Sequence, residues 1–251
     1  MKKVCLMDMD GTLTQPRKKM QKQTLKELIK LKDKFEFGIV SGSDFNYISE
    51  QCEELLRSED IEIDIFPCNG TKKYVKTNLN WNCEFSVDMK EKIGKERFHK
   101  IMFCLINLQS SLYRYAYCKE IPLNGTFIQY RDSMINWCIP GRGSLEKDRE
   151  AFKSLDKKHN LRKIMLEKLQ SSNFGFEYLD FALGGSTSID IYPKGWDKTF
   201  CLQHFDKSRQ IYFIGDKCSP EGNDFHIFEA LKPNSFEVKN PQQTIKILNE
   251  I

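Results

Sequence analysis

The stretch KVCLMDMDGT, residues 3–12, places two aspartates directly after a short apolar run. A continuous apolar run of this length is typical of a buried strand in a parallel sheet. Ligands of open α/β sheets bind at the carboxyl ends of such strands. We therefore expect Asp8 and Asp10 to stand at a strand end, where Gly11 lets the backbone turn sharply beside a bound anion.

Two carboxylates at this spacing can take different roles in phosphoryl transfer. Asp8 can attack phosphorus and carry the phosphoryl group, as carboxylates do in aspartyl-phosphate enzymes. Asp10 can protonate the leaving oxygen and then deprotonate the incoming hydroxyl. The competing interpretation is a surface turn in which Asp and Gly only satisfy the backbone geometry. The predicted strand end favours the catalytic interpretation.

Strand and helix patterns alternate from this stretch to about residue 80. Apolar spacing predicts a helix over 20–31, and FEFGIV at 35–40 predicts a second strand. Asp44 is expected to cap the next helix, and a third strand is expected over 61–66. This alternation predicts an α/β fold built on a Rossmann-like, doubly wound parallel sheet.

The pattern changes after about residue 80 and predicts an inserted domain. Longer helical segments, one of them from Ser144 to about Leu169, and paired strand segments replace the regular alternation there. The alternation resumes at Ser188, where a core strand is expected over 189–192. We expect a core domain in two parts, 1–80 and 188–251, with an α+β cap domain, 81–187, between them.

A second acidic loop follows the apolar run IYFI at 211–214. Asp216 closes this predicted strand, and Gly222-Asn223-Asp224 follows in the same loop. Mg²⁺ prefers oxygen ligands in octahedral geometry. We expect the Asp8 and Asp216 carboxylates and the Asp10 carbonyl to hold this ion. The competing interpretation is an ordinary loop in which Asp224 caps a helix.

A serine and a lysine complete this set of candidate residues. Ser41 or Ser43 can donate to a phosphoryl oxygen, and the sequence does not decide between them. Lys198 can neutralise charge on the pentacoordinate species. The order of aspartate pair, serine, lysine and acidic loop resembles the four motifs of the haloacid-dehalogenase superfamily. In that superfamily the first aspartate is the nucleophile, the second is the acid/base, and the acidic loop holds Mg²⁺.

Residues of the insert add candidate contacts to a phosphorylated ligand. Arg131 and Arg142 flank a predicted hairpin strand, and an arginine fork suits bidentate phosphate binding. Arg17, shortly after the nucleophile loop, can join them. Ser188 and Asp190 offer a hydroxyl and a carboxylate to sugar hydroxyls or phosphate. A lone arginine is as often a solvated or salt-bridged surface residue as a phosphate-binding one. Three arginines in a chain with phosphoryl-transfer motifs favour phosphate binding.

Seven collinear segments carry a more specific resemblance. They run from residue 8 to about 228: DMDGTLTQPR, FGIVSGSDF, NGTFIQYR, IPGR, SLDKKHNLR, GGSTSIDIYPKGWDK and FIGDKCSPEGND. Together they resemble the eukaryotic-type phosphomannomutase family.

The resemblance implies a function, a mechanism and an assembly. Members interconvert mannose 6-phosphate and mannose 1-phosphate, are primed by a hexose 1,6-bisphosphate, and feed GDP-mannose synthesis. We expect a cytoplasmic Mg²⁺ enzyme that is a homodimer through its cap, with a possible phosphoglucomutase side activity. Matched by position, the implied site comprises the nucleophile Asp8, the acid/base Asp10, the metal ligand Asp216, and the substrate contacts Arg17, Arg131, Arg142, Ser188 and Asp190.

The chain also departs from the family pattern. Asn124 stands where members usually carry an arginine, so one phosphate contact is missing or supplied elsewhere. Ala230 and Pro233 stand where members carry the aspartate and threonine of a second cation loop, so that site is not transferred. These departures bear on efficiency and on the preference between mannose and glucose more than on the chemistry.

Composition excludes several other classes of protein. The 251 residues carry 40% hydrophobic and 29% charged residues and a net charge of +4, without the basic stripe of a nucleic-acid binder. No run approaches the length of a membrane span. Nine cysteines without CxxC spacing indicate neither a zinc site nor a disulfide framework. We expect reduced thiols, no nucleic-acid partner and no membrane contact.

Two alternatives to a mutase remain open on the sequence alone. A related sugar phosphatase would use the same residues with water as the acceptor. A catalytically inactive binding protein on the same fold is a third possibility, which the presence of Asp8, Asp10, Lys198 and Asp216 argues against.

Overall fold

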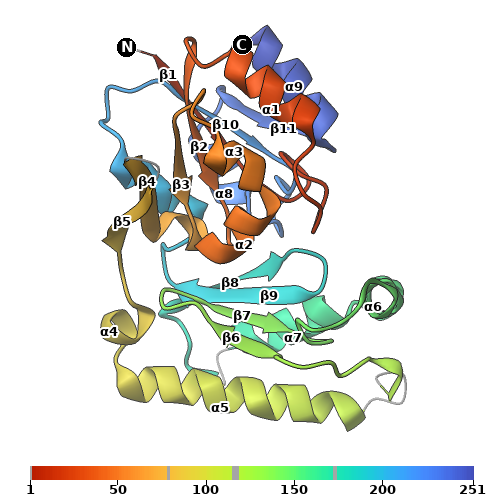
Figure 1. The fold of residues 1–251 in the computed structure, drawn as a ribbon. Coiled ribbons are helices and arrows are strands. Elements are labelled where there is room, and N and C mark those ends of the chain that lie inside the picture. Colours follow the sequence, from red (N-terminus) through yellow and green to blue (C-terminus); the bar gives the residue numbers. More distant parts are fainter. Residues whose placement is uncertain (1, 78–79, 115–118, 172–173) are drawn as a thin grey trace. The chain divides into compact units, whose positions relative to one another are not determined.

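A computed structural model describes residues 2–77, 80–114, 119–171 and 174–251 (Figure 1). The chain divides into two compact units. We call Met1–Val87 with Gly195–Ile251 the core unit, and Asp88–Lys194 the insert unit.

The core unit is built on a seven-stranded sheet with the order β11-β10-β1-β2-β3-β4-β5. The strands are β1 (Lys3–Met7), β2 (Phe35–Val40), β3 (Ile63–Phe66), β4 (Lys72–Thr77), β5 (Asn80–Ser86), β10 (Ile211–Gly215) and β11 (Ser235–Glu237). The first five strands in the sheet order run parallel, and the hairpin β4–β5 adds an antiparallel edge. Chain order proceeds in opposite directions from β1 and β10, so these neighbours form the topological switch point at which such sheets bind ligands.

Helices cover both faces of this sheet. The helical segments are α1 (Lys22–Lys30), α2 (Phe45–Gln51), α3 (Glu53–Arg57), η1 (Cys68–Gly70), η5 (Lys198–His204), α8 (Phe225–Ala230) and α9 (Pro241–Glu250). One apolar cluster packs α1 and α9 onto the sheet through Leu28 and Leu248. A separate cluster packs η5 and α8 through Cys201 and Ile227. This two-sided packing is the predicted doubly wound α/β arrangement.

The insert unit has its own antiparallel sheet, with the order β6-β7-β9-β8. Its strands are β6 (Ile128–Tyr130), β7 (Ile135–Cys138), β8 (Leu179–Gly184) and β9 (Ser188–Pro193). Its helical segments are α4 (Met89–Ile93), α5 (Lys95–Ser111), η2 (Leu112–Arg114), α6 (Glu146–His159) and α7 (Leu161–Gln170). Helix α5 runs along one face of the sheet (Figure 1), where the Trp137 indole donates to the Gln109 side chain across 2.6 Å.

The unit boundaries differ from those expected, because two strands pair differently from the sequence interpretation. Strand β5 continues the core sheet past residue 80 through its hairpin with β4. Strand β9, expected as a core strand, pairs antiparallel with β7 and β8 in the insert sheet. Ser188 and Asp190 therefore belong to the insert unit.

Helix limits differ from the expected ones in a similar way. The segment expected to be helical from Ser144 to about 169 is two helices that meet at Asn160, whose φ of 52° is left-handed. Asn tolerates this conformation better than most residues. The helix capped by Asp44 is interrupted at Cys52.

Membrane-spanning helices and disulfides are both absent from the described part of the chain. None of its helices combines the length and the apolar character that crossing a bilayer requires. Its eight cysteines are all free, and only Cys83 among them is exposed. Cys118 lies outside the described residues.

Candidate active site

Asp8 is held at the carboxyl end of the central strand of the core sheet. Residues 4–7 of β1 are buried, and Asp8 follows them directly with only 5% of the residue exposed. Its backbone N–H donates to the Ile214 carbonyl of the neighbouring strand at 2.9 Å. The run that predicted a buried strand thus places this carboxylate at the switch point of the sheet.

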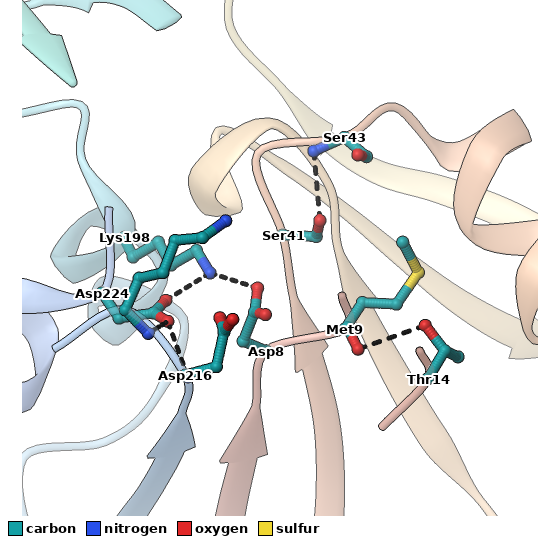
Figure 2. A network of polar contacts seen from close by, with 9 residues as sticks. Asp8, Met9, Thr14, Ser41, Ser43, Lys198, Asp216 and Asp224 are labelled. Carbon is teal, nitrogen blue, oxygen red and sulfur yellow. Dashed lines mark hydrogen bonds and ion pairs between the residues drawn. The ribbon is translucent and has the colours of Figure 1, made fainter. Parts of the chain in front are cut away.

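Three carboxylates converge at this point. Asp8, Asp216 and Asp224 each bring an oxygen within 4.8 Å of the others (Figure 2). Asp216 follows β10, the neighbour of β1, and Asp224 directly precedes α8. The Asp216 carboxylate occupies the space that a side chain at Gly11 would fill, so the sharp turn at Gly11 (φ 92°) also makes room for it.

Lys198 joins two of these carboxylates from the first residue of η5. Its side chain is fully buried, and its Nζ donates to Asp8 Oδ1 and, at 2.5 Å, to Asp224 Oδ1. The Asp197 carboxylate accepts from the Thr199 N–H at 2.7 Å and so begins η5 at this position. The ammonium is therefore fixed directly beside the expected nucleophile.

The Asp224 carboxylate bonds within the site and makes no capping bond to the helix that it precedes. One oxygen accepts from Lys198, while the other accepts from the backbone N–H groups of Asp216 and Lys217 at 3.1 and 3.0 Å. No side-chain capping bond runs from it to α8. Asp224 therefore occupies the N-cap position of α8, but its carboxylate bonds to Lys198 and to the loop after β10 and not to the helix. The sequence signal that could have found its role was a third aspartate in the loop after β10.

The charge balance of this cluster is negative. Burial raises the pKa of Asp8 to about 8, with the Asp224 and Asp216 charges adding to this effect and Lys198 opposing it. Burial, together with Asp224, raises the pKa of Asp216 to about 6, against the effect of Lys217. Burial disfavours the charged Lys198 ammonium, but Asp224 and Asp8 outweigh it and raise its pKa. If all three carboxyl groups were ionised they would exceed the single ammonium by two negative charges, and the raised pKa values of Asp8 and Asp216 show that the cluster resists this without a further cation.

A divalent cation fits this donor set. The three carboxylates supply hard oxygen ligands of the kind Mg²⁺ prefers, and two positive charges would offset their excess negative charge. Asp8 and Asp216 are the candidates for direct ligands, because both oxygens of Asp224 already accept hydrogen bonds.

Asp10 lies outside this carboxylate cluster. Its Oδ1 accepts from the Arg17 backbone N–H at 3.1 Å and from the Tyr47 hydroxyl at 3.4 Å. The tight loop between Met9 and Thr14 turns the side chain in this direction. The structure thus gives the two aspartates different surroundings, and Arg17 reaches Asp10 through its backbone while its side chain is exposed.

Ser41 and Ser43 follow β2 beside β1. Ser41 is buried, and its hydroxyl accepts from the Ser43 N–H at 3.1 Å (Figure 2). Its backbone bonds to Phe66 and Asn69 hold the turn in place. Ser43 is held as well, since its carbonyl accepts from the Cys68 N–H at 3.0 Å, so the two serines differ in that Ser41 is the more buried.

The remaining predicted site residues lie in the insert unit. Arg131 is buried, and its Nε donates to the Gln129 side chain at 3.2 Å. Arg142 donates to the Asn136 side chain at 3.1 Å. Asp190 and Ser188 are buried on β9. Asn136, which sequence reasoning missed, links Arg142 to Asp190, because its amide nitrogen donates to Asp190 Oδ1 at 2.6 Å.

Three residues depart from the family pattern, and the structure shows their surroundings: Asn124, Ala230 and Pro233. The Asn124 side chain donates to the Asp148 carboxylate at 2.9 Å. Ala230 ends α8, and neither it nor Pro233 offers a side-chain oxygen to a cation.

Comparison with known proteins decides the family. The family model described as eukaryotic phosphomannomutase matches residues 24–251. The chain belongs to the eukaryotic phosphomannomutase family. Phosphomannomutase 2 of Dictyostelium discoideum is 35% identical over 98% of this chain and 95% of its own length. Phosphomannomutase of Saccharomyces cerevisiae is 34% identical over 98% of this chain and 92% of its own length. The resemblance inferred from the sequence, to an enzyme of the phosphomannomutase family, is confirmed.

Solved structures of proteins with low sequence identity to this chain resemble its fold. N-terminally truncated IMP-nucleotidase of Plasmodium falciparum has a TM-score of 0.58 and 16% identity, covering 99% of this chain and 69% of that chain. A trehalose-6-phosphate phosphatase related protein has a TM-score of 0.51 and 17% identity, covering 98% of this chain and 96% of that chain. These likenesses support the predicted α/β fold of the haloacid-dehalogenase type.

Proposed function

We propose that the chain interconverts mannose 6-phosphate and mannose 1-phosphate through a phosphorylated Asp8. The observation that carries this proposal is the buried Asp8 carboxylate, which contacts the Lys198 ammonium beside Asp216 at the switch point of the sheet. Family membership supplies the substrate class. In this proposal the enzyme supplies mannose 1-phosphate to GDP-mannose synthesis in the cytosol and has phosphoglucomutase as a side activity.

The transfer comprises two displacements at phosphorus. An Asp8 carboxylate oxygen attacks one phosphoryl group of a hexose 1,6-bisphosphate, and the bond from phosphorus to the sugar oxygen breaks. Asp10 gives that oxygen a proton, so a hexose monophosphate leaves. A monophosphate of the other isomer then loses its hydroxyl proton to Asp10 and attacks phospho-Asp8. This step regenerates the bisphosphate and the free Asp8 carboxylate.

The neighbours of Asp8 stabilise the charge that develops in these steps. Lys198 neutralises charge on the pentacoordinate phosphorus, and Ser41, the more buried serine, donates to a phosphoryl oxygen. Asp8, Asp216 and the Asp10 carbonyl would hold Mg²⁺, which supplies further charge neutralisation when bound. Arg17, Arg131, Arg142, Ser188 and Asp190 contact the sugar phosphate, as the resemblance implies, and the arginines of the insert bind the phosphate that is not reacting.

The decisive experiment is an isomerisation assay with a catalytic amount of hexose 1,6-bisphosphate. We expect mannose 1-phosphate to be converted into mannose 6-phosphate, with Mg²⁺ required, as followed by ³¹P NMR. Inorganic phosphate as the sole product would identify the sugar phosphatase instead. Absence of both products, with the protein folded, would leave the inactive binding protein.

We further propose that the chain forms a homodimer through one face of the insert unit. Phe103 and Ile106 of α5 are 68% and 53% exposed, and Leu123 is 45% exposed. Ile106 and Leu123 also line a surface hollow of about 490 Å³ beside β6, the edge strand of the insert sheet. An apolar face next to an outer strand of the sheet suits a second copy of the same surface.

Ile106→Glu is expected to convert the dimer to a monomer, because it places a charge in the apolar face. Size-exclusion chromatography with light scattering measures the change. Leu145→Glu is the matched control, since Leu145 is equally apolar and 64% exposed but lies outside the hollow. A parent chain that is monomeric at micromolar concentration would contradict the proposal.

A further inference from the structure

One turn of the core unit has three consecutive residues in left-handed backbone conformations. Cys68, Asn69 and Gly70, which we call the η1 turn, have φ angles of 50°, 65° and 84°, and all three are buried. Glycine adopts such angles freely and asparagine tolerates them, but a cysteine with such an angle is uncommon. Strain of this kind persists only where the surrounding contacts enforce it, and it gathers at functional sites.

On one side the η1 turn is bonded to the turn that follows β2. The Cys68 N–H donates to the Ser43 carbonyl at 3.0 Å, and the Asn69 N–H donates to the Ser41 carbonyl at 2.8 Å. The η1 turn therefore fixes the backbone that carries both candidate phosphate-binding serines.

On its other side the η1 turn is bonded to η5, the segment that begins with Lys198. The Asn69 side-chain amide donates to the Trp196 carbonyl, just before η5, at 3.2 Å. At the far end of η5, His204 Nε2 donates to the Gly70 carbonyl at 2.8 Å, since a carbonyl can only accept. Neighbouring residues of one turn thus hold η5 at both ends.

Gly70 allows η5 to lie directly against this turn. A Cβ atom at position 70 would come within 2.6 Å of Cys201 Cα and 2.8 Å of Cys201 N. These are backbone atoms of η5, which cannot move aside as the end of a flexible side chain could. No side chain therefore fits between the η1 turn and η5.

The bond from Asn69 to the Trp196 carbonyl lies two residues before Lys198. Between them, the Asp197 carboxylate accepts a capping bond from the second residue of η5 and so sets where this segment begins. The Lys198 side chain is fully buried, and its ammonium contacts the Asp8 carboxylate (Figure 2). A displaced Trp196 carbonyl would therefore displace the ammonium from its place beside the expected nucleophile.

We propose that Asn69 is a positioning residue that keeps Lys198 beside Asp8 by fixing the backbone at the start of η5. The inference rests on the proposed function, because it takes phosphoryl transfer to Asp8 as the step that Lys198 assists. Since the Asn69 N–H also holds the Ser41 carbonyl, this residue links the two groups that are expected to stabilise the transferred phosphoryl group.

The test is the substitution Asn69→Gly in the full chain. Glycine adopts the left-handed conformation without strain, so the substitution removes the side-chain bond and leaves the backbone geometry accessible. With Mg²⁺ present, we expect the phosphorylation of Asp8 by acetyl phosphate, which releases acetate, to slow at least about tenfold, as followed by intact-protein mass spectrometry. A misplacement of about 1 Å can cost about 100-fold in rate.

The affinity for mannose 6-phosphate distinguishes positioning from general damage. Calorimetry is expected to give a Kd for Asn69→Gly within about twofold of the parent value, because the contact with Lys198 serves the transfer step and not the binding of the sugar. A loss of affinity as large as the loss of rate would overturn the inference.

Asn249→Gly is the matched control. The Asn249 amide also donates to a backbone carbonyl, that of Ile245 at 2.8 Å, but it is exposed near the end of α9. The substitution is expected to lower the melting temperature, because glycine weakens a helix, without slowing the phosphorylation of Asp8. An unchanged rate in Asn69→Gly, or an equal slowing in Asn249→Gly, would overturn the inference.

The same measurements separate this inference from the proposed function. Slower phosphorylation of Asp8 in Asn69→Gly, in a chain that does not isomerise mannose phosphates, would sink the proposed function alone. A parent chain in which Asp8 accepts a phosphoryl group from neither acetyl phosphate nor a hexose 1,6-bisphosphate would contradict both.

Discussion

Replacing Lys198 by methionine is expected to abolish phosphoryl transfer and to destabilise the fold by about 3–5 kcal/mol. The side chain is fully buried, and its ammonium is the shared partner of Asp8 and Asp224. Methionine has a similar length but no charge, so it would leave buried carboxylates without their hydrogen-bonding cation. Urea unfolding in EDTA measures the loss of stability, and the isomerisation assay measures the loss of activity.

Two further variants separate this effect from general damage. Lys207→Met removes an exposed lysine from the segment after η5 and is expected to change neither property. Adding Asp224→Asn to Lys198→Met removes one of the stranded carboxylates, so it should restore part of the stability and none of the activity. A Lys198→Met chain as stable as the parent would show that the buried ion pairs contribute nothing to folding.

Asp8→Asn is expected to lower the isomerisation rate by at least about 10⁴-fold while the chain stays folded. The amide retains the shape of the carboxylate but cannot attack phosphorus or accept the phosphoryl group as a carboxylate does. A rate within about tenfold of the parent would contradict the assignment of Asp8 as the nucleophile.

The same substitution should change how stability depends on pH when Mg²⁺ is removed. Burial raises the pKa of Asp8 from its ordinary 3.8 to about 8, so between these values the folded chain holds a proton that the unfolded chain releases. Stability of the parent should therefore fall as pH rises through this range, by at most about 1.4 kcal/mol per pH unit from this group. Asp8→Asn should lose this contribution and keep the fall between about pH 4 and 6 that Asp216 causes. If the stability of the parent and that of Asp8→Asn changed in parallel with pH, the assignment of this pH dependence to Asp8 would be contradicted.

The sequence could predict the core site because each part of it has a local signature. An apolar run that ends in aspartate marks the end of a buried strand, and this pattern occurs in both β1 and β10. Parallel strands present their carboxyl ends at one edge, so Asp8 and Asp216 were expected together without knowledge of the strand order. The convergence of their carboxylates agrees with that expectation.

The residues that sequence reasoning missed act through partners far away in the chain. Asp224 matched the pattern of a helix cap, and its role depends on Lys198, which reaches it from a different element. Asn136 has no distinguishing pattern in the sequence, and its role follows from the pairing of β9 with β7, which places Asp190 opposite it. The contacts of Asp224 with Lys198 and of Asn136 with Asp190 are not encoded by residue spacing within one segment, because each joins residues that are far apart in the chain.

The amino-acid sequence by itself determined the α/β class, the strand that ends at Asp8, and the family, because runs of apolar residues and short polar motifs are local properties. Tertiary structure alone decided that Ser188–Pro193 belongs to the insert sheet. A strand buried along its whole length has the same pattern in either sheet, and only the register of its neighbours distinguishes the two. The same pairing decided which amides hold Arg131 and Arg142, since side chains from separate segments become neighbours only when the strands align.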